Sequence, residues 1–202
     1  MSNFRRRLLM NVEKKYTPVE YLESTGTQYI ITDKYLDSSE LNIKTKLYVN
    51  EVPSDEHDII GNQVQNAGRF TVGLSGKRVF SFSGNQKRDN NVTSSYFTGE
   101  QILEIEVNYS YVNRLKILTV NGVTTEQSQN VEITNSNEYI TIFPRRYAGF
   151  IGKLYYMKLV KNSNEIMFDF IPVLDKDGVP CLYDKVEDKF YYNEGSGEFL
   201  YE

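Results

Sequence analysis

The stretch LNIKTKLYV, residues 41–49, decides the fold because its side chains alternate in character without a break. One side of the stretch carries aliphatic residues and a threonine: Leu41, Ile43, Thr45, Leu47 and Val49. The other side carries Asn42, Lys44 and Lys46. Since the side chains of a β-strand point alternately to opposite faces, this pattern indicates a strand with one face in a core and the other in water.

The same period of two residues recurs along most of the chain. Further stretches rich in Ile, Val, Tyr, Phe and Thr lie at residues 29–32, 69–74, 79–83, 101–109, 114–120, 138–143, 153–160 and 166–173. No long amphipathic helical pattern follows residue 15, which argues against a βαβ fold. We therefore predict an all-β protein, a two-sheet antiparallel β-sandwich that spans residues 16–202 as a single domain.

Short polar stretches between the predicted strands have the chemistry of turns. Asn121-Gly122, within TVNGVT, predicts a two-residue hairpin because both residues tolerate a positive φ. DKDG at residues 175–178 predicts a second tight turn, and GSG at 195–197 predicts a turn that closes a final hairpin. The polar connection at residues 84–100 is predicted to be a surface loop.

Composition and charge exclude several functional classes. The 202 residues are 40% hydrophobic and 25% charged, with a net charge of −4, which gives no general attraction to nucleic acid. One cysteine and one histidine allow neither an internal disulfide nor a Cys/His zinc site, and no cofactor or metal is predicted. No apolar run is long enough to cross a membrane or to form a signal-peptide core, so we expect synthesis in the cytoplasm without export by a cleaved signal.

The first 15 residues differ from the rest of the chain. They hold five basic residues and one acidic residue, a charge of +4, which leaves −8 for the remainder. Residues 2–14 can form a short amphipathic helix, although so short a helix is marginal in water without a surface to lie on. We predict that residues 1–15 are a basic anchor tail, helical or extended; the alternative is a frayed terminus. The residues expected to contact a partner are Phe4, Arg5, Arg6, Arg7, Leu8 and Leu9.

Two longer stretches carry a family resemblance. PVEYLESTGTQYI at residues 18–30 resembles an N-terminal signature of concanavalin A-like (laminin-G-like) jelly-roll proteins of gut bacteriophages and gut bacteria. GKLYYMKLV at 152–160 and MFDFIPVLDKDGVPCLYDKVEDKFYYNEGSGEF at 167–199 resemble the closing signature of the same group. The leader MSNFRRRLLM also resembles the start of such proteins from phages of gut Bacteroidales.

The resemblance implies a virion structural protein: a capsid decoration, head-fibre or tail-associated subunit. Its expected partners are capsid or other virion proteins and further copies of the same chain, and its expected location is the virion. In this fold the first strand lies beside a late strand, so residues 29–31 are expected to pair with residues 154–159 or 168–171. The alternative function is a glycan-binding adhesion module on the particle or on the bacterial surface.

Candidate reactive groups are few, and no catalytic residue is predicted. Concanavalin A-like glycosidases use paired carboxylates, but Glu104 and Glu106 match that pattern incompletely and are interpreted as a solvated strand face, so a glycoside hydrolase is the least favoured function. The 175–178 turn lacks a first calcium ligand, because Val173 occupies that position. His57 and Cys181 are interpreted as a surface histidine and a buried cysteine rather than as a catalytic dyad.

The stretch around residues 143–150 is the most distinctive predicted loop. Arg145, Arg146 and Tyr147, flanked by Phe143 and Phe150, have the chemistry to grip a carboxylate of a neighbouring subunit or to stack on a sugar. The alternative is a solvated loop tip. The chain has no tryptophan, so its 16 tyrosines would supply any aromatic sugar contact.

Overall fold

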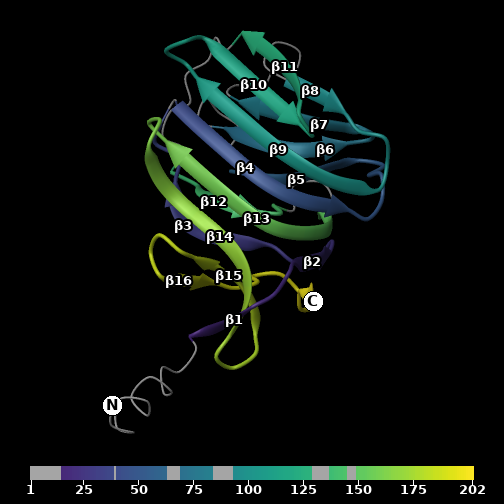
Figure 1. Ribbon diagram of the computed structural model, residues 1–202, viewed down its shortest axis with the longest axis vertical. Coiled ribbons are helices and arrows are strands. Elements are labelled where there is room, and N and C mark those ends of the chain that lie inside the picture. The colour runs from purple at the N-terminus through teal and green to yellow at the C-terminus, as the bar shows by residue number, and fades with distance from the viewer. Residues whose placement is uncertain (1–14, 39, 63–68, 84–92, 129–136, 145–148) are drawn as a thin grey trace, which may run out of the picture.

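The computed structural model describes residues 15–38, 40–62, 69–83, 93–128, 137–144 and 149–202 (Figure 1). Two antiparallel sheets pack face to face, and the described residues contain no helix. The predicted all-β sandwich is therefore confirmed. None of these residues forms a helix long and apolar enough to cross a membrane.

The larger sheet, sheet A, lies in front in Figure 1 and has eleven strands in the described part of the chain. Its main path runs β11-β10-β9-β4-β13-β14-β15-β16; in addition, β1 pairs with β14, β2 pairs with β13, and β17 pairs with β2. The strands are β1 (Tyr16–Pro18), β2 (Leu22–Thr25), β4 (Glu40–Val49), β9 (Gln101–Ser110), β10 (Leu115–Val120), β11 (Val123–Ser128), β13 (Ile151–Lys161), β14 (Glu165–Asp175), β15 (Pro180–Asp184), β16 (Lys189–Tyr191) and β17 (Leu200–Tyr201).

The smaller sheet, sheet B, lies behind sheet A and has six strands in the order β3-β12-β5-β6-β7-β8, again within the described residues. These strands are β3 (Ile30–Tyr35), β5 (Glu56–Gly61), β6 (Phe70–Ser75), β7 (Arg78–Ser83), β8 (Thr93–Tyr96) and β12 (Tyr139–Ile142). Strand β8 falls inside the connection predicted as a loop at 84–100, so that prediction is wrong for residues 93–96, and residues 84–92 lie outside the described part of the chain.

Strand β4 is the strand that the opening stretch predicts, and it lies between β9 and β13 in sheet A. It pairs with β9 over ten residues without a break, from Glu40 opposite Ser110 to Val49 opposite Gln101. Its inward residues are all buried, as are the inward residues of β9: Leu41, Ile43, Thr45, Leu47, Val49, Leu103, Ile105 and Val107. The core between the sheets therefore follows directly from the alternation in the sequence.

The N-terminal signature pairs with late strands, but through other residues than predicted. Residues 29–31 do not reach β13 or β14, since Ile30 and Ile31 pair with β12 in sheet B. Strand β2 makes the late contact instead, with Leu22 opposite Leu154 of β13, and β1 pairs with β14. The prediction fails because the chain leaves sheet A at Gly26 and enters sheet B.

The turn at Gly26 explains the motif STGTQ. Gly26 has φ 97°, which favours glycine, and the side chain of Gln28 accepts hydrogen bonds from Thr25 N (2.9 Å) and Ser24 Oγ (3.1 Å). A Cβ atom at Gly149 would lie 1.9 Å from the carbonyl oxygen of Gly26, so position 149 has no room for a side chain. Two glycines thus allow the two chain segments to touch where the chain changes sheet.

Two of the three predicted turns are confirmed. Asn121 and Gly122 have positive φ and join β10 to β11, and the 175–178 turn joins β14 to β15. The predicted hairpin around residues 195–197 is wrong. This segment instead donates backbone hydrogen bonds to Thr27 and Tyr29, while β17 pairs with β2.

The described chain begins at the base of the predicted tail, and residues 1–14 lie outside it. The Lys15 ammonium group forms an ion pair with Asp188 (2.5 Å) and lies 5.5 Å from the ring centroid of Tyr183. The Tyr16 ring packs on Tyr183 at 4.5 Å between centroids. These contacts fix residues 15 and 16 against the β15–β16 hairpin.

Candidate functional site

A cavity of about 460 Å³ opens on the outer face of sheet A, where β4 begins, β9 ends and β10 begins. We call it the β4–β10 groove. Its lining residues are Glu40, Leu41, Asn42, Lys44, Asn108, Tyr109, Ser110, Asn113, Leu115, Ile117 and Ser163. The strand register explains this composition, because Asn42 stands opposite Asn108, and Asn108 stands opposite Ile117 on the next strand. The groove therefore lies across three neighbouring strands.

A network of hydrogen bonds orders the polar side of the groove. The Asn42 amide donates to Glu106 Oε1 (2.7 Å) and to Asn108 Oδ1, and Lys44 Nζ lies 3.2 Å from Glu106. Partial burial on its own raises the pKa of Glu106, but hydrogen bonds from Asn42, Lys44 and Asn108 together hold it below its ordinary value. The carboxylate is therefore ionised at neutral pH and orients the two amides.

The rest of the groove is formed by acceptors, hydroxyls and an apolar wall. Glu40 accepts hydrogen bonds from Ser110 Oγ (3.2 Å) and Ser163 Oγ (3.3 Å). Leu115 and Ile117, both half-buried, line the side formed by β10. The groove can thus hold a ligand with a polar rim and an apolar face.

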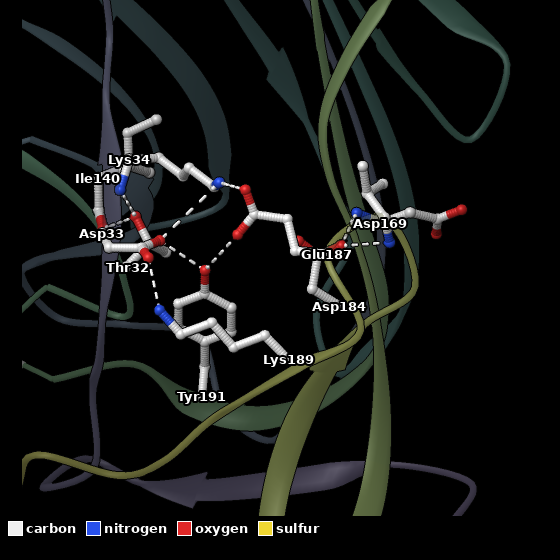
Figure 2. Close-up of polar contacts among 10 residues, drawn as sticks. Thr32, Asp33, Lys34, Ile140, Asp169, Asp184, Glu187, Lys189 and Tyr191 are labelled. Atoms are coloured by element: carbon white, nitrogen blue, oxygen red, sulfur yellow. Dashed lines mark hydrogen bonds and ion pairs between the residues drawn. The ribbon is translucent and has the colours of Figure 1, made fainter.

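A second polar cluster joins the two sheets (Figure 2). We call it the β3–β16 cluster; its members are Asp33, Lys34, Glu187, Lys189 and Tyr191. Lys189 Nζ lies 2.5 Å from Asp33 Oδ2, and the Tyr191 hydroxyl donates to Asp33 Oδ1 (2.5 Å). Lys34 forms an ion pair with Glu187, whose other oxygen lies 3.4 Å from the Tyr191 hydroxyl. Each carboxylate therefore has a cationic partner within the protein.

The electrostatics of the β3–β16 cluster suit a structural role. Burial alone raises the pKa of Asp33, but hydrogen bonds from Lys189 and Tyr191 and the charges of both lysines hold it below its ordinary value. Burial and the hydrogen bond to Asp33 raise the pKa of Tyr191. Tyr191 is therefore a neutral hydroxyl donor between Asp33 and Glu187, and the cluster ties β3 of sheet B to β16 of sheet A.

Buried Asp184 orders the turn that carries Glu187. Its Oδ1 accepts backbone hydrogen bonds from Asp169 (3.0 Å) and Val186 (3.0 Å), as Figure 2 shows in part. Lys185 pairs with Asp169 at 3.0 Å. These contacts hold the β15–β16 turn against β14 and so place Glu187 beside β3.

The candidate acids of the sequence lie on a solvated strand face, as predicted. Glu104 lies 3.8 Å from Lys46 and Glu106 lies 3.2 Å from Lys44, so both form cross-strand ion pairs. The 175–178 turn is held by Asp175, whose Oδ1 accepts hydrogen bonds from the backbone of Asp177 and Val179, each at 2.9 Å. No group of three or more His, Cys, Asp or Glu side chains in the described ranges is arranged to hold a metal ion.

The interpretation of His57 is wrong in one respect. His57 is 6% exposed, and burial lowers its pKa although Glu51 and Asp55 act in the opposite direction. Acidic neighbours in the sequence do not outweigh the position of the residue in β5. Cys181 is buried, as predicted, and burial raises the pKa of its thiol to about 12. The two residues belong to different sheets.

The predicted contact residues are only partly within the described structure. The tail residues Phe4, Arg5, Arg6, Arg7, Leu8 and Leu9 and the loop residues Arg145, Arg146 and Tyr147 lie outside it. The flanking Phe143 and Phe150 are buried and stack on each other at 4.6 Å between ring centroids. These two rings belong to the core, so the expectation that they flank an exposed contact loop is corrected.

Sequence reasoning missed the groove and a buried lysine. Asn42 and Asn108 occupy strand positions, where asparagine is uncommon, and this was the available signal for the groove. Lys116 on β10 points into the core, where its ammonium group donates to Ser81 O (3.2 Å). Burial lowers the pKa of Lys116 to about 7. This lysine lies inside the sandwich and contributes nothing to the groove.

The comparisons with known proteins identify the fold. No protein-family model and no curated protein matches the chain. A putative carbohydrate-binding protein from Bacteroides ovatus superposes with a TM-score of 0.63 at 10% identity, over 92% of this chain and 60% of that protein. Domains LG4-5 of the mouse laminin alpha1 chain give a TM-score of 0.53 at 12% identity, over 78% of this chain and 43% of that one.

A heptameric SAP-like pentraxin from Limulus polyphemus gives a TM-score of 0.51 at 9% identity, over 70% of this chain and 73% of that one. At such identities the likeness establishes architecture alone. The chain has the concanavalin A-like (laminin-G-like) jelly roll that its sequence signatures imply. The virion role implied by the same signatures stays a prediction.

Proposed function

We propose that this chain is a non-enzymatic glycan-binding module and that the β4–β10 groove is its ligand site. The observation that carries the proposal is the groove itself, in which ordered amide, ammonium and carboxylate groups face an apolar wall. Sugars present hydroxyl groups that both donate and accept hydrogen bonds, together with apolar C–H faces. Asparagine offers both kinds of hydrogen-bonding group, and the groove has an asparagine on each of two adjacent strands.

The order of the polar network supports binding. Asn42, Asn108 and Glu106 are already held by one another, so these protein side chains lose less conformational entropy when a ligand binds than free side chains would. The fold likeness adds an argument by analogy, because the Bacteroides ovatus structure is described as a putative carbohydrate-binding protein. This analogy concerns architecture and names no residue.

The carboxylates of the groove argue for binding without hydrolysis. A glycosidase pairs one carboxylic acid of raised pKa with a second carboxylate. The pKa of Glu106, which lies behind the groove amides, is lowered, and Glu106 is engaged by Lys44 and two amides. Glu40 accepts two serine hydroxyls. Glu106 is therefore not prepared to donate a proton to a leaving oxygen.

A glycan array followed by calorimetric titration of the best ligand tests the proposal. Asn108→Ala removes a groove amide, and we expect it to weaken binding by about tenfold or more, which is ~1.4 kcal/mol. Asp177→Ala is the matched control, because it removes an exposed side chain of the same size from the β14–β15 turn. Its affinity should equal that of the wild type. Absence of any array ligand, or equal affinities for Asn108→Ala and the control, would refute the groove as a glycan site.

A second candidate function is docking on a capsid or other virion protein through residues 1–15. One observation favours it. Strand β14 pairs with β13 near the groove, at Glu165 opposite Lys161, and with β1 at its other end, at Asp175 opposite Tyr16. Eleven residues of strand span about 34 Å, so the base of the tail and the groove lie at opposite ends of the molecule (Figure 1). A module anchored by its tail would present the groove outward.

The docking candidate has its own test. We expect the chain among the proteins of purified phage particles by mass spectrometry. Deletion of residues 1–14, which retains Lys15 and Tyr16, should leave the thermal midpoint unchanged and abolish incorporation. Normal incorporation of the deletion variant would refute the anchor. Glycan binding by the groove is independent of this result.

A further inference from the structure

The outer face of sheet A continues beyond the groove as a regular track of side chains along β4. Asn42, Lys44, Lys46 and Tyr48 occupy alternate positions of β4, so all four point to this face. The β4–β9 register has no bulge, so the row keeps an even spacing of about 7 Å and is about 20 Å long from Asn42 to Tyr48. A single sugar ring covers only a fraction of that length.

The far end of the track is apolar and aromatic. Tyr48 stands opposite Ile102 of β9, which is 45% exposed although it is a large aliphatic residue. On the other side of β4, Tyr156 of β13 stands opposite Lys46, next to an irregularity in the β4–β13 register. Tyrosine is rigid and amphipathic, so it can cover the apolar face of a sugar while its hydroxyl stays in water.

The middle of the track carries charges that cancel. Lys44 pairs with Glu106 (3.2 Å) and Lys46 pairs with Glu104 (3.8 Å), so two cations stand against two anions. On the neighbouring strand β13, Lys158 stands opposite Lys44, and Lys153 stands opposite Tyr48 and, on β2, opposite Glu23. With Glu40 at the groove end, four cations stand against four anions on this face, so it lacks the excess of cations that a sulfated or uronic polymer needs. Its alternating donors and acceptors suit hydroxyl groups instead.

Building on the proposed glycan-binding function, we infer that the ligand is a linear, uncharged oligosaccharide that lies along β4, with one end in the β4–β10 groove and the other over Tyr48 and Ile102. The site thus has a polar groove with an apolar wall at one end, a row of ion pairs in its middle, and an apolar and aromatic surface at the other end. Affinity for such a ligand depends on chain length until the track is covered, and it depends little on salt.

A size series of neutral oligosaccharides tests the inference, with cello-, xylo-, manno- and malto-oligosaccharides from disaccharide to hexasaccharide as probes in calorimetric titration. For the wild type we expect affinity to rise by about tenfold along at least one series. Tyr48→Ala and Ile102→Ala should lower affinity for the hexasaccharide and leave the disaccharide unchanged. Asn108→Ala should weaken binding at every length. Tyr201→Ala, at an exposed tyrosine of β17, is the matched control and should behave as the wild type.

Several outcomes separate the inference from the function on which it rests. Equal affinities at all lengths, or wild-type binding by both Tyr48→Ala and Ile102→Ala, would overturn the extended site while the groove stands. A loss of affinity of more than about tenfold when NaCl is raised to about 0.5 M would overturn the uncharged ligand. Absence of binding by every probe, with folding confirmed by circular dichroism, would overturn both proposals.

Discussion

The β3–β16 cluster and the β4–β10 groove are both networks of charged and polar side chains at the surface, but they differ in where their partners lie. In the cluster, Lys189 reaches Asp33 across 156 residues of sequence and joins two sheets. In the groove, Asn42 and Asn108 are direct neighbours within one sheet and border a cavity. Polar groups that pair with one another across the two sheets stabilise the fold. Polar groups that border a cavity can also bind a ligand.

The two regions also differ in what stands behind their polar groups. Tyr191 of the cluster is 5% exposed, and its ring packs edge-on against Phe170 of the core at 5.2 Å. In the groove, the half-buried wall of Leu115 and Ile117 faces the cavity. Changes in the cluster should therefore affect folding, and changes in the groove should affect binding.

Tyr191→Ala should have the largest effect. It removes a buried aromatic ring and leaves Asp33 without one of its donors, so we expect the free energy of unfolding to fall by about 3–5 kcal/mol in urea titration. Tyr191→Phe, which keeps the ring and removes the hydroxyl, should cost about 1–2 kcal/mol. The folded fraction of both variants should bind glycan with wild-type affinity. A weaker glycan affinity in Tyr191→Phe would show that the cluster and the groove are coupled.

Asn42→Ala should have the opposite profile. It removes the amide that bridges Glu106 and Asn108, so glycan affinity should fall by about tenfold in calorimetric titration. The free energy of unfolding should change by less than about 1 kcal/mol, because the side chain is half-exposed and its partners can turn to water. If Asn42→Ala instead destabilised the fold and left the glycan affinity unchanged, the groove network would be structural and not a ligand site.

The dependence of the free energy of unfolding on acid pH should also differ between the two regions, although by less than the effects above. The folded pKa values of Asp33 and Glu106 are both lowered, so each carboxylate stabilises the fold above about pH 4 and loses that contribution as pH falls through its folded pKa. Asp33→Asn should flatten the acid limb of unfolding more than Glu106→Gln does, because only Asp33 joins two sheets. Urea titrations between about pH 7 and pH 3 measure this. Equal slopes for the two variants would contradict the distinction.

The fold was predictable where the information is local. The alternation in residues 41–49 gives the buried face of β4, and Asn121-Gly122 gives a hairpin whose geometry depends on those two residues. The partner of residues 29–31 was not predictable, because it depends on the turn at Gly26 and on its contact with Gly149, more than 100 residues away. Pairing across such distances is decided by packing of the whole chain.

The site was less predictable than the fold. Asn42 and Asn108 form a pair only through the register of two strands, 66 residues apart in sequence. The alternation of β10 was readable, yet it did not reveal that Lys116 points inward, because a lysine is expected on the wet side of a strand. Lys116 and His57 are polar residue types that are expected at the surface, yet both are buried because they lie on the inward face of their strands.

The contact between Gly26 and Gly149 has a consequence for mutational tolerance. A library randomised at position 149 and sorted for folded molecules should retain glycine alone, although the residue lies in no strand and does not line the groove. Even alanine would push its Cβ into the opposing carbonyl oxygen. Where the chain crosses between the two sheets, position 149 should therefore tolerate as few substitutions as the centre of the core. The restriction comes from contact between backbone atoms, not from side-chain packing.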